Sequence, residues 1–112
     1  MRIYDLRDEE GRVVAFEVPN TWLGRRGALR VIRAIAGARI TRRPHAFTLF
    51  AEEDFCEFTL GDVTFGISEP FGDNSRYWIG PLPVLWCPEV EDVRAAFAAA
   101  GPFGLWASRA VG

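Results

Sequence analysis

The alternation of apolar and polar residues is clearest on either side of Gly61 and Asp62, which separate two alternating segments. A glycine-containing pair at this position is typical of a β-hairpin with a two-residue turn. Counting outward from the turn places six apolar residues on one face, pairing Leu60 with Val63, Phe58 with Phe65, and Cys56 with Ile67. Because a shift of one residue would turn this face toward water, the pattern also predicts the register. We therefore predict strands over residues 54–60 and 63–69.

A second hairpin is predicted at the N-terminus, with strands over residues 3–7 and 12–18. Residues 9–11 form a three-residue loop, in which Gly11 adopts the left-handed conformation that such loops require. This register places three pairs of residues opposite each other: Tyr4 with Phe16, Leu6 with Val14, and Asp8 with Arg12. The apolar residues of both strands are therefore expected on one shared face.

Residues 22–36 show the 3.6-residue apolar period of an amphipathic helix. Asn20 or Thr21 is expected to cap its N-terminus, and Gly37 suits its C-terminal end. Gly24 weakens the first turns, which favours a later start of the regular helix. The apolar side of this helix is formed by Ala28, Val31, Ile32, Ile35 and Ala36. The opposite side is a basic face that consists of Arg26, Arg30 and Arg33.

A second helix is predicted to begin at Pro88, because proline is tolerated at the first helical position. Acidic residues follow directly, and they suit the positive end of the helix dipole. Gly101 and Pro102 stop this helix. Its buried stripe is expected to consist of Val90, Val93, Phe97 and Ala100.

Further extended segments are predicted over residues 39–42, 47–51 and 75–80. Prolines then recur up to Pro88, so this part of the chain lies on a sheet edge or in a loop. An edge strand at residues 81–86, with Leu85 or Trp86 exposed, could pair with a second copy of the chain. We therefore expect a monomer or a weak dimer.

The predicted elements follow the order ββα, then three or four strands, then a helix. Hairpins imply an antiparallel sheet, and two amphipathic helices can bury their apolar sides against one face of it. The sequence therefore predicts the α+β class, with an antiparallel sheet of about five to six strands and two helices packed on one face. The 112 residues fit one domain over residues 1–101, followed by a C-terminal tail over residues 102–112.

Charge is distributed unevenly along the chain, whose net charge is −2. Residues 18–51 contain seven arginines and no acidic residue. The basic face of Arg26, Arg30 and Arg33 could bind a phosphate backbone or an acidic protein. Because nucleic-acid-binding domains are usually basic overall, a protein partner is favoured over nucleic acid. The chain has no lysine, which excludes Schiff-base chemistry.

The least generic segment of the chain runs from a loop into the strand at residues 75–80. It combines hydrogen-bonding, cationic and aromatic side chains, namely Glu69, Asp73, Asn74, Ser75, Arg76, Tyr77 and Trp78. The arginine supplies a planar hydrogen-bonding fork, and the aromatic residues supply rigid stacking surfaces. Such a group could recognise a partner's carboxylate or a small polar ligand. The turn and strand preferences of these residue types also explain their presence without any ligand.

The sequence contains no recognised motif for catalysis or cofactor binding. Cys87 precedes the second predicted helix, but only its presence and that of the single histidine, His45, support a catalytic pair. One histidine and two separated cysteines match no metal-ligand spacing. We therefore expect no catalytic residue, no metal and no cofactor. Without an export signal or a membrane span, the expected location is the cytoplasm, with both thiols reduced.

Together these observations predict a small non-catalytic binding module, a protein-interaction or regulatory accessory domain. Its partner is expected to be a protein, and no membrane association is expected. A first alternative is a small-ligand-binding domain or an enzyme, with a site composed of Arg76 with Asp73 or Glu69, beside Tyr77 and Trp78. A second alternative is nucleic-acid binding through the basic face of the first helix.

Overall fold

A computed structural model of the protein describes residues 1–42, 54–69 and 76–101. These residues form one six-stranded antiparallel sheet and two helices, which confirms the predicted α+β class. The elements are β1 (Tyr4–Arg7), β2 (Val13–Pro19), α1 (Asn20–Ala34), β3 (Ala38–Arg42), β4 (Asp54–Leu60), β5 (Val63–Ser68), β6 (Arg76–Pro81) and α2 (Pro88–Ala99). The strand order is β1-β2-β6-β5-β4-β3. The expected strand at residues 47–51 and the expected tail lie outside the described residues.

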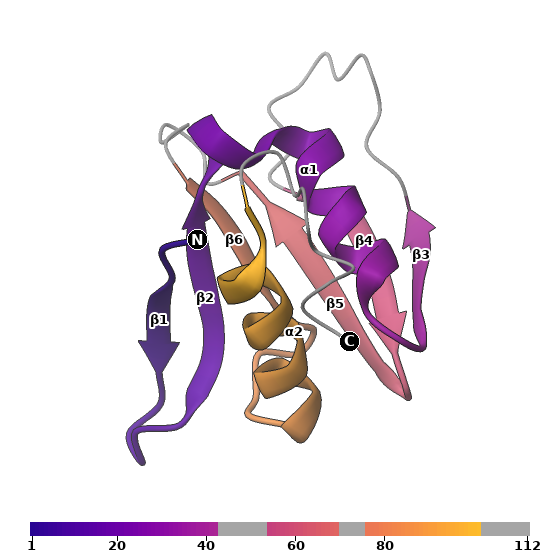
Figure 1. Cartoon of the computed structure of the whole chain (residues 1–112). Helices are drawn as coiled ribbons and strands as arrows, with labels where there is room; N and C mark the ends of the chain where they lie inside the picture. Colours follow the sequence, from indigo (N-terminus) through magenta and orange to yellow (C-terminus); the bar gives the residue numbers. More distant parts are fainter. Residues whose placement is uncertain (43–53, 70–75, 102–112) are drawn as a thin grey trace.

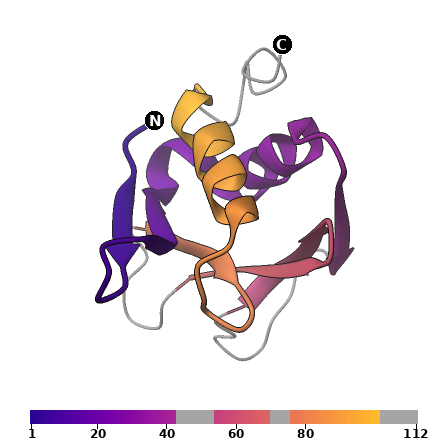
Figure 2. The same cartoon turned by 90° about the horizontal axis from the view of Figure 1, so that it is seen from below.

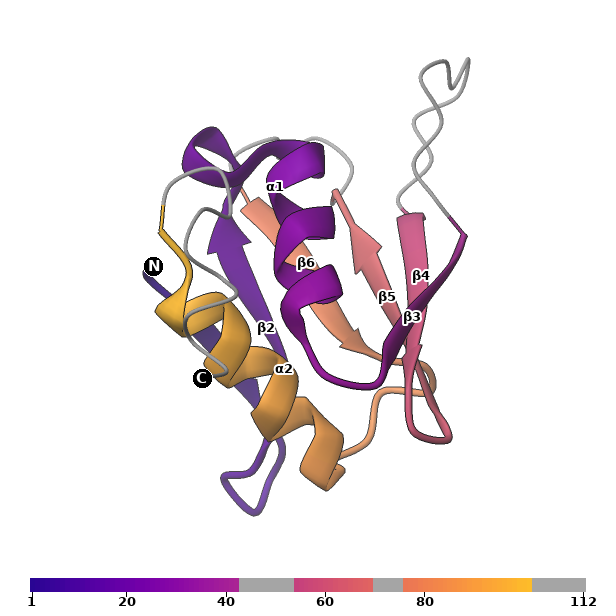
Figure 3. The same ribbon diagram turned by 45° about the vertical axis from the view of Figure 1, so that its right-hand side comes forward.

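Both helices pack on the same face of the sheet, as Figures 1 and 2 show. In the view of Figure 3, α1 crosses in front of the central strands, and α2 lies beside it in front of β2. We call this side of the sheet the helix-covered face and the opposite side the open face. Because successive side chains of a strand point to opposite faces, each strand contributes to both.

The core fills the space between the helices and the helix-covered face. Its largest fully buried side chains include Phe16, Phe58, Phe65 and Phe97. Where α2 contacts β2, the rings of Phe97 and Phe16 pack edge to face, with their centroids 5.7 Å apart. A bidentate pair also joins α2 to the sheet: Arg94 donates from Nε and Nη2 to the two Asp5 carboxylate oxygens, at 2.6 and 3.0 Å. This pair holds the pKa of Asp5 below its usual value.

The hairpin of β4 and β5 has the predicted register. Leu60 pairs with Val63, Phe58 with Phe65, and Cys56 with Ile67. The rings of Phe58 and Phe65 stack with centroids 5.1 Å apart, and both are fully buried. Gly61 has φ 61°, the left-handed conformation that this turn requires.

The register predicted for the hairpin of β1 and β2 is wrong. Asp5 pairs with Phe16 and Leu6 with Ala15, whereas Arg7 pairs with Val13, so an irregularity follows Leu6. The predicted loop is nevertheless present, because Gly11 has φ 83° and the Asp8 N–H donates to the Arg12 carbonyl oxygen at 2.9 Å. The one-residue shift moves Tyr4 and Leu6 from the helix-covered face to the open face.

The first helix begins directly after β2, earlier than predicted. Pro19 occupies the N-cap position, so the prediction that Asn20 or Thr21 occupies it is wrong. Gly24 adopts φ 67° and ψ 167° and interrupts the helix, because it lies where the chain changes direction. Regular helix follows this kink and ends at Ala34, two residues before the predicted end. Within the predicted apolar side, Ala36 is exposed, and the other four residues are buried.

The second helix agrees with its prediction. Pro88 occupies the first turn, and the predicted stripe of Val90, Val93, Phe97 and Ala100 is buried. Of the two alternatives predicted for this segment, a sheet edge or a loop, residues 82–87 form a loop that follows the end of β6 at Pro81. Leu85 and Trp86 are exposed as expected.

Candidate functional site

The residues predicted to form one site lie on two sides of the sheet. Within β6, Tyr77 points into the core and is 4% exposed, whereas Arg76 and Trp78 point to the open face. Glu69 follows β5 and is within reach of α1, on the helix-covered side. The remaining predicted residues, Asp73, Asn74 and Ser75, lie outside the described residues. The described part of the predicted group therefore divides into a buried half and an open half.

The buried half connects α1 to the sheet. Arg25 Nε donates to Glu69 Oε1 at 2.9 Å, which ties the kinked start of α1 to the end of β5. Burial, and to a smaller extent the Glu69 carboxylate, raises the pKa of Tyr77 to about 12, whereas the Arg25 guanidinium acts in the opposite direction. The Arg25–Glu69 ion pair therefore ties α1 to the sheet, and Tyr77 is part of the core beneath the helices.

The open half of the predicted group lies beside two residues that the sequence analysis did not select. The Arg76 guanidinium lies 3.5 Å from the centroid of the Tyr4 ring, and its Nη1 is 3.2 Å from Glu17 Oε1. Stacking on an aromatic face and an ion pair together fix the direction of the arginine side chain. Trp78 lies directly opposite Glu17 in the pairing of β2 with β6. We call Tyr4, Glu17, Arg76 and Trp78 the sheet-face cluster.

Trp78 lies flat on the sheet because Gly80 leaves room for its ring. A β-carbon placed at Gly80 would lie 2.8 Å from the ring of Trp78 and 2.8 Å from the β-carbon of Ala15. Leu82 covers Gly66 in a similar way, with its Cδ1 3.1 Å from the corresponding position. Two glycines in adjacent strands thus allow two apolar side chains to lie on the open face.

The shift in β1 explains why the sequence analysis missed Tyr4. In the predicted register Tyr4 faced the core, opposite Phe16, whereas the observed pairing places it opposite Glu17. Glu17 was missed because its neighbour Trp78 belongs to a strand that is distant in the sequence. The alternation within β2 predicts that Glu17 and Phe16 point to different faces of the sheet. Only the strand order, however, places Glu17 beside Trp78.

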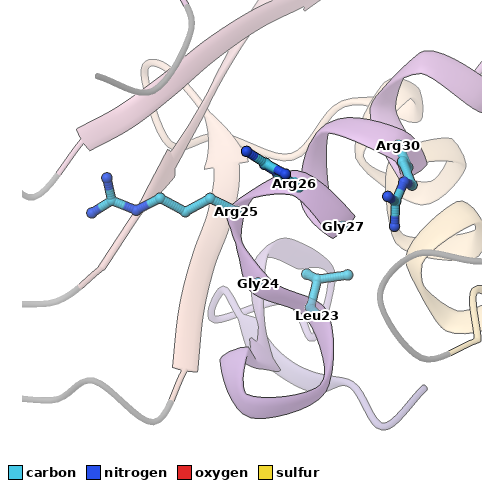
Figure 4. Close-up of a pocket in the computed structure, with 6 residues that line it drawn as sticks. All are labelled: Leu23, Gly24, Arg25, Arg26, Gly27 and Arg30. Carbon is cyan, nitrogen blue, oxygen red and sulfur yellow. The ribbon is translucent and has the colours of Figure 1, made fainter. Parts of the chain in front are cut away.

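The basic face of α1 borders an open groove with a volume of about 470 Å³, shown in Figure 4. Its lining comes from the kinked start of the helix and consists of Leu23, Gly24, Arg25, Arg26, Gly27 and Arg30. The three arginine side chains extend in different directions in Figure 4 and do not converge on one point. Arg26, Arg30 and Arg33 are all exposed, as predicted. This arrangement presents positive charge over a broad surface and offers no focused site for a single anion.

The thiol of Cys87 is poorly suited to act as a nucleophile. Burial raises its pKa, and the nearby Glu89 carboxylate raises it further, although the Val90 N–H at the helix start acts in the opposite direction. Its proposed base, His45, lies outside the described residues. Across residues 1–42, 54–69 and 76–101, no three His, Cys, Asp or Glu side chains are grouped to hold a metal ion.

No protein-family model, curated protein or solved structure matches the chain. Neither helix of the described residues is long and apolar enough to cross a membrane. The functional argument therefore depends on the geometry of the chain's own residues.

Proposed function

We propose that this protein is a small non-catalytic binding module that recognises a partner protein through the sheet-face cluster. One observation supports this most strongly: the open face presents Tyr4, Arg76 and Trp78 together. The solvated face of an antiparallel sheet normally carries mainly polar side chains. Tyrosine, tryptophan and arginine are the residue types that contribute most of the binding energy in protein interfaces.

The cluster is also held in place before any partner arrives. Stacking on Tyr4 and the ion pair with Glu17 restrain Arg76, and the space above Gly80 restrains the ring of Trp78. Side chains that are already ordered lose little conformational entropy on binding. A partner that supplies a carboxylate to Arg76 and an apolar or aromatic group to Trp78 would match this surface.

The alternative small-ligand site receives less support from the geometry. It combined Arg76 with Asp73 or Glu69, beside Tyr77 and Trp78. Asp73 lies outside the described residues, and Glu69 and Tyr77 lie on the opposite side of the sheet from Arg76 and Trp78. Nucleic-acid binding by the basic face of α1 has the exposed arginines it needs, but the side chains of Arg26 and Arg30 extend in different directions in Figure 4. We propose a regulatory or accessory role, because a non-catalytic binding module acts through the protein that it binds. The proposed location is the cytoplasm.

The proposal is tested by affinity capture from a lysate of the source cells, with and without nuclease. The bait proteins are the wild type, Arg76→Ala and Trp78→Ala, with Arg33→Ala as the matched control on α1. We expect one protein partner at near-stoichiometric amounts that survives nuclease, is lost with both sheet-face variants and is retained by the control. Equal capture by all four baits, or recovery of nucleic acid alone, would contradict the proposal.

A further inference from the structure

A second exposed surface lies in the segment between β6 and α2. The five residues from Leu82 to Trp86 are all apolar, and all five are exposed. The exposed fractions are 46% for Val84, 64% for Leu85 and 36% for Trp86. Consecutive exposed apolar residues are unfavourable in water and typically mark a surface that another molecule covers. We call Val84, Leu85 and Trp86 the loop patch.

The loop patch lies between two turns at one end of the molecule. Figures 1 and 3 place the β1–β2 turn, the β4–β5 turn and the start of α2 at this same end. The Arg12 guanidinium lies 5.3 Å from the ring centroid of Trp86, which connects the patch to the first turn. Glu89 reaches the second turn, since its Oε2 is 3.7 Å from where a β-carbon would lie on Gly61.

The charge around the loop patch is negative. The two arginines of the first turn are already paired: Arg12 with Asp8 and Glu10, at 3.3 and 2.9 Å, and Arg7 with Asp5, at 3.1 Å. Five further carboxylates at this end have no ion-pair partner among the described residues, namely Glu9, Asp62, Glu89, Glu91 and Asp92. An apolar centre with an excess of carboxylates around it, its acidic rim, is complementary to a basic segment that also carries apolar side chains.

We propose that the loop patch docks a basic, amphipathic segment of a partner protein. Apolar side chains of that segment cover Val84, Leu85 and Trp86, and its lysine and arginine side chains face the acidic rim. The length of β6 separates the loop patch from Arg76, because Arg76 begins this strand and Val84 follows its end at Pro81, about 17 Å away at the rise of a strand. Two separate surfaces would allow the module to bind two partners, as an adaptor does.

The docking proposal is tested with a labelled 14-residue peptide of leucine and lysine whose leucines fall on one face of a helix. A peptide of the same composition, with the leucines scrambled, is the control for charge alone. Fluorescence anisotropy with the full chain should show at least tenfold tighter binding of the amphipathic peptide. Leu85→Ser should weaken that binding at least tenfold without changing the melting temperature, because the side chain is exposed.

The same assay tests whether the acidic rim contributes to peptide binding, and whether the loop patch binds independently of the sheet-face cluster. Glu9→Gln/Glu91→Gln/Asp92→Asn should weaken binding and reduce its salt dependence, whereas Arg76→Ala and Arg33→Ala should bind the peptide like the wild type. Equal binding of both peptides, or an unchanged affinity with Leu85→Ser, would overturn the proposal. A dimer that forms with rising concentration, is abolished by Leu85→Ser and excludes the peptide would also overturn it, because a second copy would then be the occupant. Loss of peptide binding with Arg76→Ala would show that the two surfaces are not independent.

Discussion

The two faces of the sheet differ in what their side chains contact. On the helix-covered face, Phe16, Phe58 and Phe65 are fully buried beneath the helices. On the open face, Arg76 and Trp78 are half-buried and contact their neighbours in the plane of the sheet. Consecutive residues of a single strand therefore belong to different surfaces, one buried in the core and one accessible to a partner. Substitutions on the helix-covered face should lower stability, and substitutions in the sheet-face cluster should lower binding.

The largest expected effect is on the helix-covered face. Phe58→Ala removes a fully buried ring that stacks on Phe65, so we expect it to lower the free energy of unfolding by about 3–5 kcal/mol. Urea unfolding measures this loss, with Phe58→Leu as a control that keeps most of the buried volume. A change below about 1 kcal/mol for the alanine variant would contradict the position assigned to the core.

A smaller effect is expected where the open face is most tightly packed. In Gly80→Ala the new β-carbon would lie 2.8 Å from Ala15 and Trp78, so the ring must move, at a cost of about 1–3 kcal/mol. Gly66→Ala is the matched control, because its nearest atom, at 3.1 Å, is the flexible end of Leu82. Urea unfolding of both variants should show the greater loss for Gly80→Ala. Equal losses would mean that Trp78 does not lie over Gly80.

The buried Tyr77 predicts that the stability of the protein depends on pH. The pKa of Tyr77 is about 12 in the folded protein, against an ordinary value of 10.0, so the unfolded chain loses its proton first. The stabilisation is therefore complete below pH 10 and is lost as the pH rises toward 12, by up to about 1.4 kcal/mol per pH unit. Unfolding free energies of wild type and Tyr77→Phe at pH 9, 10 and 11 measure this. The wild type should lose more stability than the variant, and identical slopes would contradict the burial of the hydroxyl group.

Much of the fold could be predicted because local signals agreed with one another. The turn at Gly61 and the apolar pairs of β4 and β5 required the same register, and a slip would have exposed Phe58 and Phe65. For α2, Pro88 and the apolar stripe pointed to the same helix. The irregularity after Leu6 could not be predicted, because an irregularity of this kind leaves the alternation on each side intact and changes only the phase between the strands.

The candidate site was predicted only in part, for two physical reasons. Neighbouring residues of a strand point to opposite faces, so Arg76, Tyr77 and Trp78 could not all belong to one surface. The predicted strand at residues 75–80 was sufficient to show this. The identity of the neighbours depended on strand order, which brings β2 and its Glu17 beside β6. No local pattern encodes that long-range pairing.

The most direct test of the central claim measures binding and stability for one pair of matched variants. Arg76→Ala and Arg33→Ala each remove one arginine, the first from the sheet-face cluster and the second from the exposed side of α1. Titration calorimetry with the captured partner should show at least a tenfold weaker affinity for Arg76→Ala and an unchanged affinity for Arg33→Ala. Urea unfolding should show that Arg76→Ala lowers stability by no more than about 1–2 kcal/mol. If Arg76→Ala binds like the wild type, or unfolds as readily as Phe58→Ala, the open face is not the recognition surface that this account assigns to it.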